Sequence, residues 1–289
     1  MPGSYIVAGA RTPIGKMSGA LASFSAAELG GFAIAEALRR AGVAPHEVEH
    51  VIMGQVLTAG QGQVPSRQAA VKAGIPMNVP SININKVCLS GLNSIYLADQ
   101  MISNGDADIV IAGGMESITN SPYLAMGARS GFRFGDVQLL DAIQRDGLWC
   151  AFDACLMGLG TERYAAGDIS RDAQDDLAMK SNQRAAAAIA DGRLADEIVS
   201  ISIPQRKGDP VVISADEGVR ASTTMESLAS LKPAFDKNGT VTAGNASQIS
   251  DAGSAIVMMS KRAAEKRGVK PLGEFVSYGM VAGPDNASL

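Results

Sequence analysis

Short apolar runs alternate with amphipathic helical patterns through the first part of the chain. The apolar runs predict buried strands, at residues 5–8, 51–57, 82–87 and 108–112. Between these strands, apolar positions three or four residues apart predict helices, over 25–42, over 66–73 and directly after residue 88. Several of the strands are apolar on both faces. The alternation therefore predicts an α/β layered fold with a mostly parallel or mixed sheet.

The same order of elements returns near the end of the chain. A strand over 255–259 precedes a helix over 261–267, and a further apolar run predicts a strand over 274–281. No helical pattern follows this last run before Leu289. Because both faces of such a sheet need cover, we expect the chain to be cut and not finished at its C-terminus.

The middle of the chain, residues 118–245, has a different texture. Polar turns dominate, strong strand patterns are few, and one long helix is predicted over about 170–190. Asp172 lies in the first turn of that helix, where it meets the helix dipole, and Gly192 follows its end. We interpret this region as an insertion over the sheet.

Composition excludes several classes of protein. Hydrophobic residues make up 46% of the 289 residues and the net charge is -4, so general disorder is excluded. Only 4% of the residues are aromatic, and a nucleic-acid binder would need concentrated positive charge that this chain lacks. No apolar run is long enough for a membrane span, and the start lacks the pattern of a secretory leader. We expect an intracellular, cytoplasmic protein that binds no nucleic acid.

The two histidines and three cysteines limit the possible chemistry. His46 and His50 have charged neighbours and are interpreted as surface residues, which leaves little material for a catalytic triad or a metal site. We therefore expect no bound metal. The spacing of the cysteines does not indicate a disulfide framework. Cys150 and Cys155 lie in an apolar stretch and are interpreted as packing residues.

Cys88 is the candidate nucleophile. It lies where an apolar strand turns into a helix, and the N-terminus of a helix favours the thiolate form of cysteine. A buried structural cysteine is the alternative interpretation. A second candidate is the segment 240–247, whose small polar residues suit an amide-bearing ligand but also suit an ordinary turn. No histidine near Cys88 in sequence offers a base.

Four segments of this sequence closely resemble the thiolase family. They are Ala10–Gly15 (ARTPIG), Asn85–Ser94 (NKVCLSGLNS), Gly113–Ser117 (GGMES) and Asn238–Ser247 (NGTVTAGNAS). The resemblance covers essentially the whole chain in order. It implies a thiolase-like layered fold with a first domain at 1–117 and 246–270, a coenzyme A-binding loop domain at 118–245, and the start of a second half at 271–289.

The resemblance also implies a reaction and a set of contacts. Cys88 would attack the thioester of acetyl-CoA or the ketone of a 3-ketoacyl-CoA and hold the acetyl group, with its own backbone N–H in an oxyanion hole. Coenzyme A thioesters would be substrates, with no tightly bound cofactor, and the protein would be a homodimer or homotetramer. The implied coenzyme A contacts are Leu148, Met157, Arg220, Ser227, Phe235, Ala243, Gly244 and Ser247.

Two departures from the family pattern bear on activity. Leu156 stands where members specialised for acetoacetyl-CoA often have histidine, which puts the short-chain preference in doubt. The Gly-His-Pro and Cys-x-Gly motifs of the family's second half are absent from this sequence, so we expect most of that half to be missing and turnover to be weak or absent. The alternatives are a 3-ketoacyl-CoA thiolase of β-oxidation with longer substrates, a non-catalytic acyl-CoA or lipid-binding protein, and a cysteine hydrolase.

Overall fold

The computed structural model describes residues 3–165 and 167–282, which form two compact units. The first, here called the sheet unit, consists of residues 1–121, 195–217 and 250–278. The second, the loop unit, consists of residues 122–194, 218–249 and 279–289. Of the predicted segment 271–289, residues 283–289 lie outside the described part. Each unit is taken here by itself.

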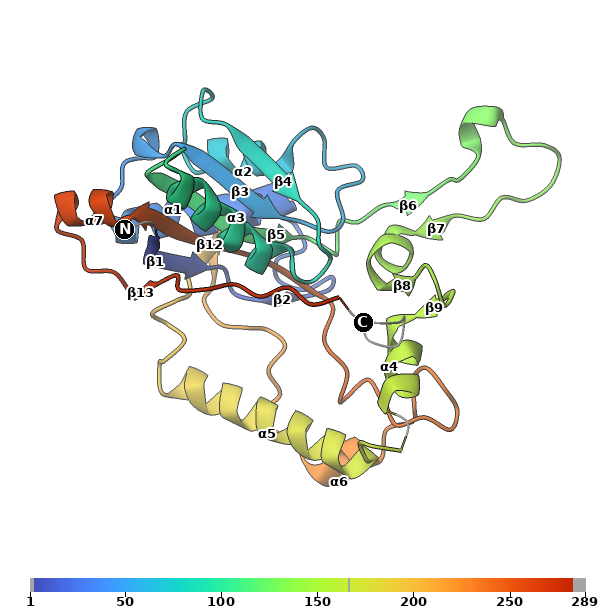
Figure 1. The fold of residues 1–289 in the computed structure, drawn as a ribbon. Coiled ribbons are helices and arrows are strands. Elements are labelled where there is room, and N and C mark those ends of the chain that lie inside the picture. The colour runs from blue at the N-terminus through green and yellow to red at the C-terminus, as the bar shows by residue number, and fades with distance from the viewer. Residues whose placement is uncertain (1–2, 166, 283–289) are drawn as a thin grey trace. The chain divides into compact units, whose positions relative to one another are not determined.

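A mixed sheet forms the centre of the sheet unit (Figure 1). Its strands run in the order β13-β1-β12-β5-β3-β4, with β2 paired to β12. The β3–β4 and β3–β5 pairs are parallel, whereas the β5–β12, β12–β1, β1–β13 and β12–β2 pairs are antiparallel. The predicted parallel pattern therefore holds for part of the sheet. The strands are β1 (Ser4–Arg11), β2 (Gly15–Lys16), β3 (His50–Gly54), β4 (Ser81–Ile84), β5 (Ile109–Glu116), β12 (Ser250–Ser260) and β13 (Gly273–Glu274).

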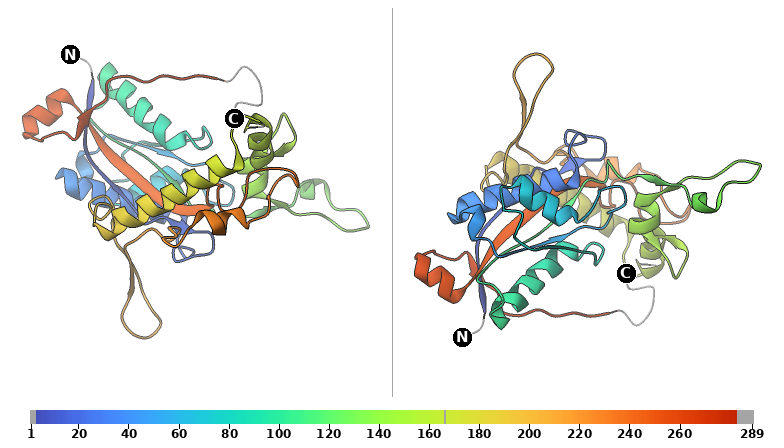
Figure 2. Two further views of the ribbon diagram at one scale, coloured as in Figure 1. Left: turned by 90° about the horizontal axis from the view of Figure 1, so that it is seen from below. Right: turned by 90° about the horizontal axis from the view of Figure 1, so that it is seen from above.

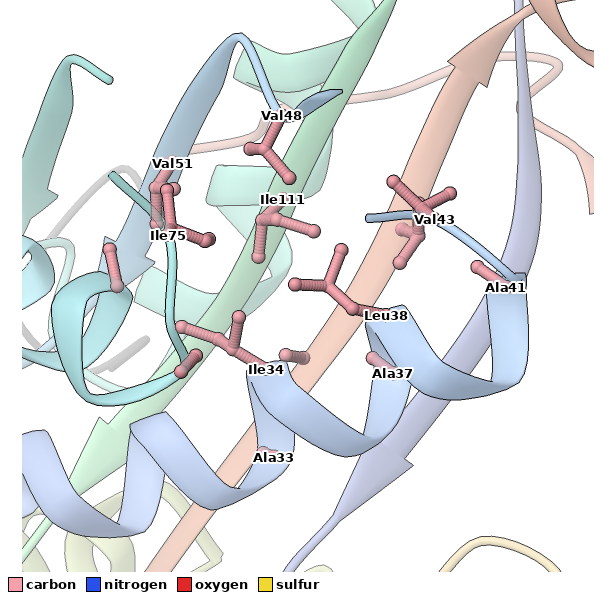
Figure 3. Close-up of a cluster of buried hydrophobic side chains, with 14 of the residues drawn as sticks. Ala33, Ile34, Ala37, Leu38, Ala41, Val43, Val48, Val51, Ile75 and Ile111 are labelled. Carbon is pink, nitrogen blue, oxygen red and sulfur yellow. The ribbon is translucent and has the colours of Figure 1, made fainter. Parts of the chain in front are cut away.

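Helices cover both faces of this sheet. Its helices are α1 (Ala26–Ala41), α2 (Pro65–Lys72), α3 (Ser90–Asn104), α7 (Lys261–Arg267) and a short 3-10 turn, η1 (Pro45–Glu47). The helices α1, α2 and α7 share one apolar core with the strands, and Figure 3 shows Ile34 and Leu38 of α1 directed toward Ile111 of β5. The helix α3 belongs to a second core, in which Ala98 and Ile102 pack with Val110. Apolar residues alternate along the strands and recur every three or four residues along the helices, and these positions form the two cores.

The ends of α1 follow from its sequence. Ser25 and Glu28 form the capping box, in which the Glu28 carboxylate accepts a hydrogen bond from the Ser25 backbone N–H at 2.9 Å. Gly42 ends the helix with a φ of 61°, a left-handed conformation that glycine adopts without strain. Both ends confirm the predicted helix.

A hairpin of β10 (Ile201–Ile203) and β11 (Val211–Ile213) also belongs to the sheet unit. Ile201 packs with Leu21 and Leu29 in a third, smaller core. Figure 2 shows the hairpin turn as a long projecting loop, coloured yellow-brown. Residues 195–217 lie in the middle of the chain, so this packing shows that part of the polar middle region returns to the sheet.

The loop unit consists of short strands and helices joined by long connections. Its elements are β6 (Tyr123–Leu124), η2 (Ala128–Ser130), β7 (Leu140–Asp141), a π-helix (Ile143–Leu148), β8 (Trp149–Cys150), β9 (Cys155–Leu156), α4 (Met157–Ala165), α5 (Arg171–Ala190) and α6 (Met225–Ala229). The predicted long helix is α5, and the Ser170 hydroxyl caps it by accepting a hydrogen bond from the Ala173 N–H at 3.2 Å. In the described part of this unit, two strand pairs of two residues each and one isolated bridge between Pro233 and Thr242 form, in keeping with the few strand patterns of the sequence.

The strand predicted over 274–281 is wrong beyond Glu274. β13 pairs with β1 only at two positions, Tyr5 and Ile6, and residues 275–282 form no strand. The Tyr278 ring instead stacks on Tyr96 of α3, with ring centroids 4.4 Å apart. Val276 is 85% exposed. An apolar run predicts burial, but a strand also needs a neighbour with free backbone groups, and sequence alone does not supply one.

Candidate active site

Cys88 lies in the short connection between β4 and α3, two residues before the helix begins. Its side chain is exposed, which excludes the alternative of a buried structural cysteine. Leu89 is the N-cap of α3, so Cys88 stands just outside the first turn and not within it. The predicted place between a strand and a helix N-terminus is thus confirmed, with the residue slightly farther from the helix.

The turn that carries Cys88 is held in an unusual conformation. Val87, directly before the cysteine, has a φ of 49°, a left-handed conformation that is strained for a β-branched residue. Three hydrogen bonds fix it: the Val87 N–H donates to Asn85 Oδ1 at 2.9 Å, the Ser90 hydroxyl donates to the Val87 carbonyl at 2.6 Å, and the Lys86 N–H donates to Ser90 Oγ at 2.8 Å. These bonds fix the backbone conformation next to Cys88.

Cys88 lines a cavity of about 520 Å³ in the sheet unit. The cavity lies between the start of α3 and the ends of β3, β5 and β12, and glycines form much of its wall. At Gly54, an added Cβ would lie 2.5 Å from the Ser90 backbone. At Gly114, it would lie 3.4 Å from the Gly91 Cα. The helix start therefore approaches the strands more closely than side chains would permit.

Glu116, the last residue of β5, lines the same cavity. Burial, with a smaller contribution from the nearby Asp251 carboxylate, raises the pKa of its carboxyl to about 7. Hydrogen bonds from two backbone donors act in the opposite direction and lower the pKa. The donors are the Val56 N–H at 2.8 Å and the Leu57 N–H at 3.3 Å. At neutral pH this group is thus able both to accept and to release a proton. Glu116 lies in the segment Gly113–Ser117, and neither the residue pattern nor the family resemblance assigned it a role. The signal that could have found it is a lone carboxylate at the end of an apolar strand.

Neither histidine lines this cavity. His46 lies in the exposed turn η1, and His50 begins β3, at the end of the strand opposite to Gly54. His46 is exposed, as predicted, whereas His50 is half-buried, and burial lowers its pKa below the usual value. An imidazole base for Cys88 is therefore absent from the cavity.

Five of the eight predicted coenzyme A contacts line one cavity in the loop unit. This cavity has a volume of about 630 Å³ and is bordered by α5, the start of α6 and the segments around residues 218–223 and 243–248. Its size falls within the range of small-molecule sites. The five residues are Arg220, Ser227, Ala243, Gly244 and Ser247.

Buried polar contacts hold the wall of the loop-unit cavity. Asp175 of α5 is 1% exposed and accepts hydrogen bonds from Arg171 Nε at 2.7 Å and from Asn245 Nδ2 at 2.9 Å. The Thr242 N–H donates to Asn245 Oδ1 at 2.7 Å. Arg220 and Asn182 also line the cavity, and the Arg220 backbone N–H donates to Asn182 Oδ1 at 2.9 Å. The small polar segment 240–247 is thus held in place by these bonds, and its residues 243–247 line the cavity.

The other three predicted contacts lie elsewhere in the loop unit. Leu148 ends the π-helix, Met157 begins α4, and the ring of Phe235 lies against Gly158. None of them lines the cavity that holds the other five. Leu148 and Met157 flank the β8–β9 hairpin on its two sides, so one hairpin positions both.

The described residues offer neither a metal site nor a membrane span. Among residues 3–165 and 167–282, no three His, Cys, Asp or Glu side chains gather as metal ligands would. Across the same residues, no helix combines the length and apolar character that crossing a bilayer requires.

Comparisons with known proteins agree with this geometry. The family model for the thiolase N-terminal domain matches residues 4–262. A probable acetyl-CoA acetyltransferase of Mycolicibacterium smegmatis is 54% identical over 97% of this chain and 73% of its own length. A probable acetyl-CoA acetyltransferase of Mycobacterium tuberculosis is 53% identical, over 99% of this chain and 73% of its own length. An acetyl-CoA acetyltransferase of Cupriavidus necator is 51% identical, over 94% of this chain and 70% of its own length.

The family match spans the exposed cysteine, its glycine-walled cavity and the polar segment of the loop unit. At about half of all positions identical to three relatives, the match extends far beyond a few motifs. On this ground the chain belongs to the thiolase family.

Proposed function

We propose that this chain carries the nucleophile and the coenzyme A site of an acetyl-CoA acetyltransferase, an enzyme that passes an acetyl group between coenzyme A thioesters. The observation that carries the proposal is the exposed Cys88 on its strained turn at the mouth of a cavity, in a chain of the thiolase family. A residue held at positive φ next to a nucleophile is typical of sites where strain fixes geometry.

The first half-reaction needs only groups that this chain contains. The Cys88 thiolate adds to the thioester carbonyl of acetyl-CoA, and the backbone N–H groups near the start of α3 stabilise the resulting oxyanion. The C–S bond to coenzyme A then breaks, coenzyme A leaves as its thiolate, and the acetyl group remains as a thioester on Cys88. Small residues at Ser90 and Gly91 leave space for the reacting carbonyl.

The loop-unit cavity is proposed to hold coenzyme A. Arg220 is the cationic residue that lines it, and its guanidinium suits a phosphate group or the face of an adenine ring. Ala243, Gly244 and Ser247 would lie along the pantetheine, where small side chains and backbone amides fit an amide-bearing chain. Leu148, Met157 and Phe235 are proposed as further contacts outside this cavity.

The second half-reaction needs an acid or base that the sheet-unit cavity supplies only through Glu116. No imidazole lines the cavity, so the 289-residue chain is expected to acquire the acetyl group but to turn over slowly. The preferred acyl length and the expected homodimer or homotetramer remain predictions. Light scattering on the purified chain measures the oligomeric state directly.

Intact mass after treatment with acetyl-CoA tests the nucleophile. The wild-type chain is expected to gain one acetyl group that hydroxylamine removes, because a thioester reacts with hydroxylamine, and Cys88→Ala is expected to gain none. Cys155→Ser keeps Cys88 and serves as the matched cysteine control. An acetyl adduct that survives in Cys88→Ala would contradict the assignment. Binding without any adduct would favour the acyl-CoA-binding alternative.

Calorimetric titration with coenzyme A tests the binding cavity. Arg220→Ala is expected to weaken binding about tenfold, because a charged hydrogen bond contributes about 1.5–3 kcal/mol when fully formed. Arg206→Ala, an exposed arginine in the turn of the β10–β11 hairpin, is the matched control and should leave the affinity unchanged. Equal affinities for the two variants would remove Arg220 from the site.

A further inference from the structure

Two cysteines outside the nucleophile's cavity face each other across a short hairpin. In the antiparallel pair of β8 and β9, Cys150 lies directly opposite Cys155 in the register (Figure 1). Directly opposed residues in an antiparallel pair point to the same face of the ribbon. Both thiols are buried and free. The sequence predicted packing residues, which the burial confirms, but the pairing of the two is visible only in the structure.

The geometry of such a pair fits a disulfide. Opposed Cα atoms in antiparallel strands are about 4.5 or 5.5 Å apart, and both values fall inside the range of about 4.4–6.8 Å that disulfides span. Their Cβ atoms are typically about 4.5–5.5 Å apart, so the strands need to approach by roughly 1 Å to reach the usual disulfide value. Only four residues connect β8 to β9, and so short a hairpin permits its two strands to move by this amount.

The surroundings of the two sulfurs are polar and lie close to solvent. The Asp153 N–H in the turn donates to Cys150 Sγ at 3.4 Å, and Arg163 Nη1 of α4 donates to Cys155 Sγ at 3.7 Å. The turn itself is open, with Phe152 82% exposed. Because the two cysteines are 7% and 6% exposed, a small reagent reaches them only when the turn and the Arg163 side chain move aside.

We propose that Cys150 and Cys155 form a reversible disulfide by exchange with a small disulfide such as oxidised glutathione. One cysteine thiolate attacks a sulfur of the reagent, the reagent's S–S bond breaks, and one glutathione thiolate leaves. The second cysteine sulfur then attacks the mixed disulfide, the Cys150–Cys155 bond forms, and the second glutathione leaves. The two cysteines are oxidised, the reagent is reduced, and the two thiol protons pass to the two glutathione thiolates.

The disulfide would act on the neighbouring contacts of the loop unit. Leu148 directly precedes β8 and Met157 directly follows β9, so a bond across the hairpin fixes the separation of these two residues. Both hairpin cysteines belong to the loop unit, whereas Cys88 belongs to the sheet unit.

Peptide mass spectrometry after equilibration in a glutathione buffer tests the proposal. The chain is prepared as Cys88→Ala, so that only the two hairpin cysteines react, and free thiols are then blocked with an alkylating reagent. Trypsin releases residues 146–163 as one peptide that contains both cysteines. This peptide is expected to lack two hydrogen atoms and to carry no alkyl group. The same chain unfolded in urea is the reference, and the folded chain should form the disulfide with an equilibrium constant at least about tenfold higher.

Single-cysteine variants and the wild-type chain complete the design. Cys150→Ser and Cys155→Ser, each combined with Cys88→Ala, should give at most one glutathione adduct and never the lighter peptide. In the wild-type chain, the exposed Cys88 reports that the oxidant is active by gaining glutathione. Equal constants in the folded and unfolded chains, or two alkylated hairpin cysteines in a sample whose Cys88 carries glutathione, would overturn the proposal. Because the key comparison needs no substitution in the hairpin, it holds even if a variant fails to fold.

Discussion

The cavity that Cys88 lines and the loop-unit cavity that Arg220 lines are built in opposite ways. In the sheet unit, close backbone contacts between glycines shape the cavity around Cys88, and regular strands and a helix surround it. In the loop unit, side-chain hydrogen bonds centred on Asp175 and Asn245 hold long connections in place around the other cavity. The first arrangement holds the backbone around Cys88 with little freedom. The second allows a loop-rich region to form a fixed wall with few regular elements.

The difference makes the sheet-unit cavity most sensitive to added volume. Gly54→Ala places a methyl group against the backbone of Ser90 and Gly91, so α3 must move away from β3. We expect a loss of more than about 3 kcal/mol in the free energy of unfolding, measured by urea denaturation. Gly273→Ala is the matched control, because an added Cβ there meets no heavy atom within 4 Å. A loss below about 1 kcal/mol at Gly54 would show that the cavity tolerates side chains.

Glu116 is the polar exception within the glycine-walled cavity, and it should make stability depend on pH. Its pKa is raised from 4.5 to about 7, so the folded chain holds the proton more tightly than the unfolded chain. The contribution of Glu116 to stability is then complete below pH 4.5 and is lost as the pH rises through 7, by up to about 3 kcal/mol. Glu116→Gln should remove this fall.

Urea denaturation at pH 5 and pH 8 checks the Glu116 prediction. The loss of stability between the two pH values should be smaller in Glu116→Gln than in the wild type. Glu226→Gln, at an exposed position on α6, should leave the wild-type loss unchanged. If Glu116→Gln keeps the full loss, other groups cause it.

The loop-unit cavity should depend on its hydrogen bonds instead. Asp175→Ala removes the carboxylate that pairs with the partly buried Arg171 and accepts from the Asn245 amide, which then keep only backbone carbonyl acceptors. We expect a loss of about 2 kcal/mol together with weaker coenzyme A binding. Asp176→Ala, on the next residue of α5, removes only a surface pair with Lys180 and should cost about 0.5 kcal/mol or less. Thermal unfolding and calorimetric titration of the two variants measure the difference. Equal losses in the two variants would show that the side-chain hydrogen bonds of Asp175 do not hold the wall of the loop-unit cavity.

Much of the fold follows from local patterns in the sequence. The capping box at Ser25, the long helix α5 and the strand before Cys88 all lie where their patterns predict them, because caps and periodic apolar faces are local properties. The apolar run after Glu274 fails for the opposite reason. Whether such a run becomes a strand depends on a free neighbour in the sheet, and that neighbour is decided far away in the sequence.

The site divides in the same manner. The sequence by itself singled out Cys88, which lines the sheet-unit cavity, and, through the family resemblance, five residues that line a single cavity of the loop unit. Only the tertiary structure decided three further features: the antiparallel half of the sheet, the proton-binding state of Glu116 and the opposed pair of Cys150 and Cys155. Each of these depends on how deeply a group is buried or on which distant residue faces it, and neither property is contained in a local pattern of residues.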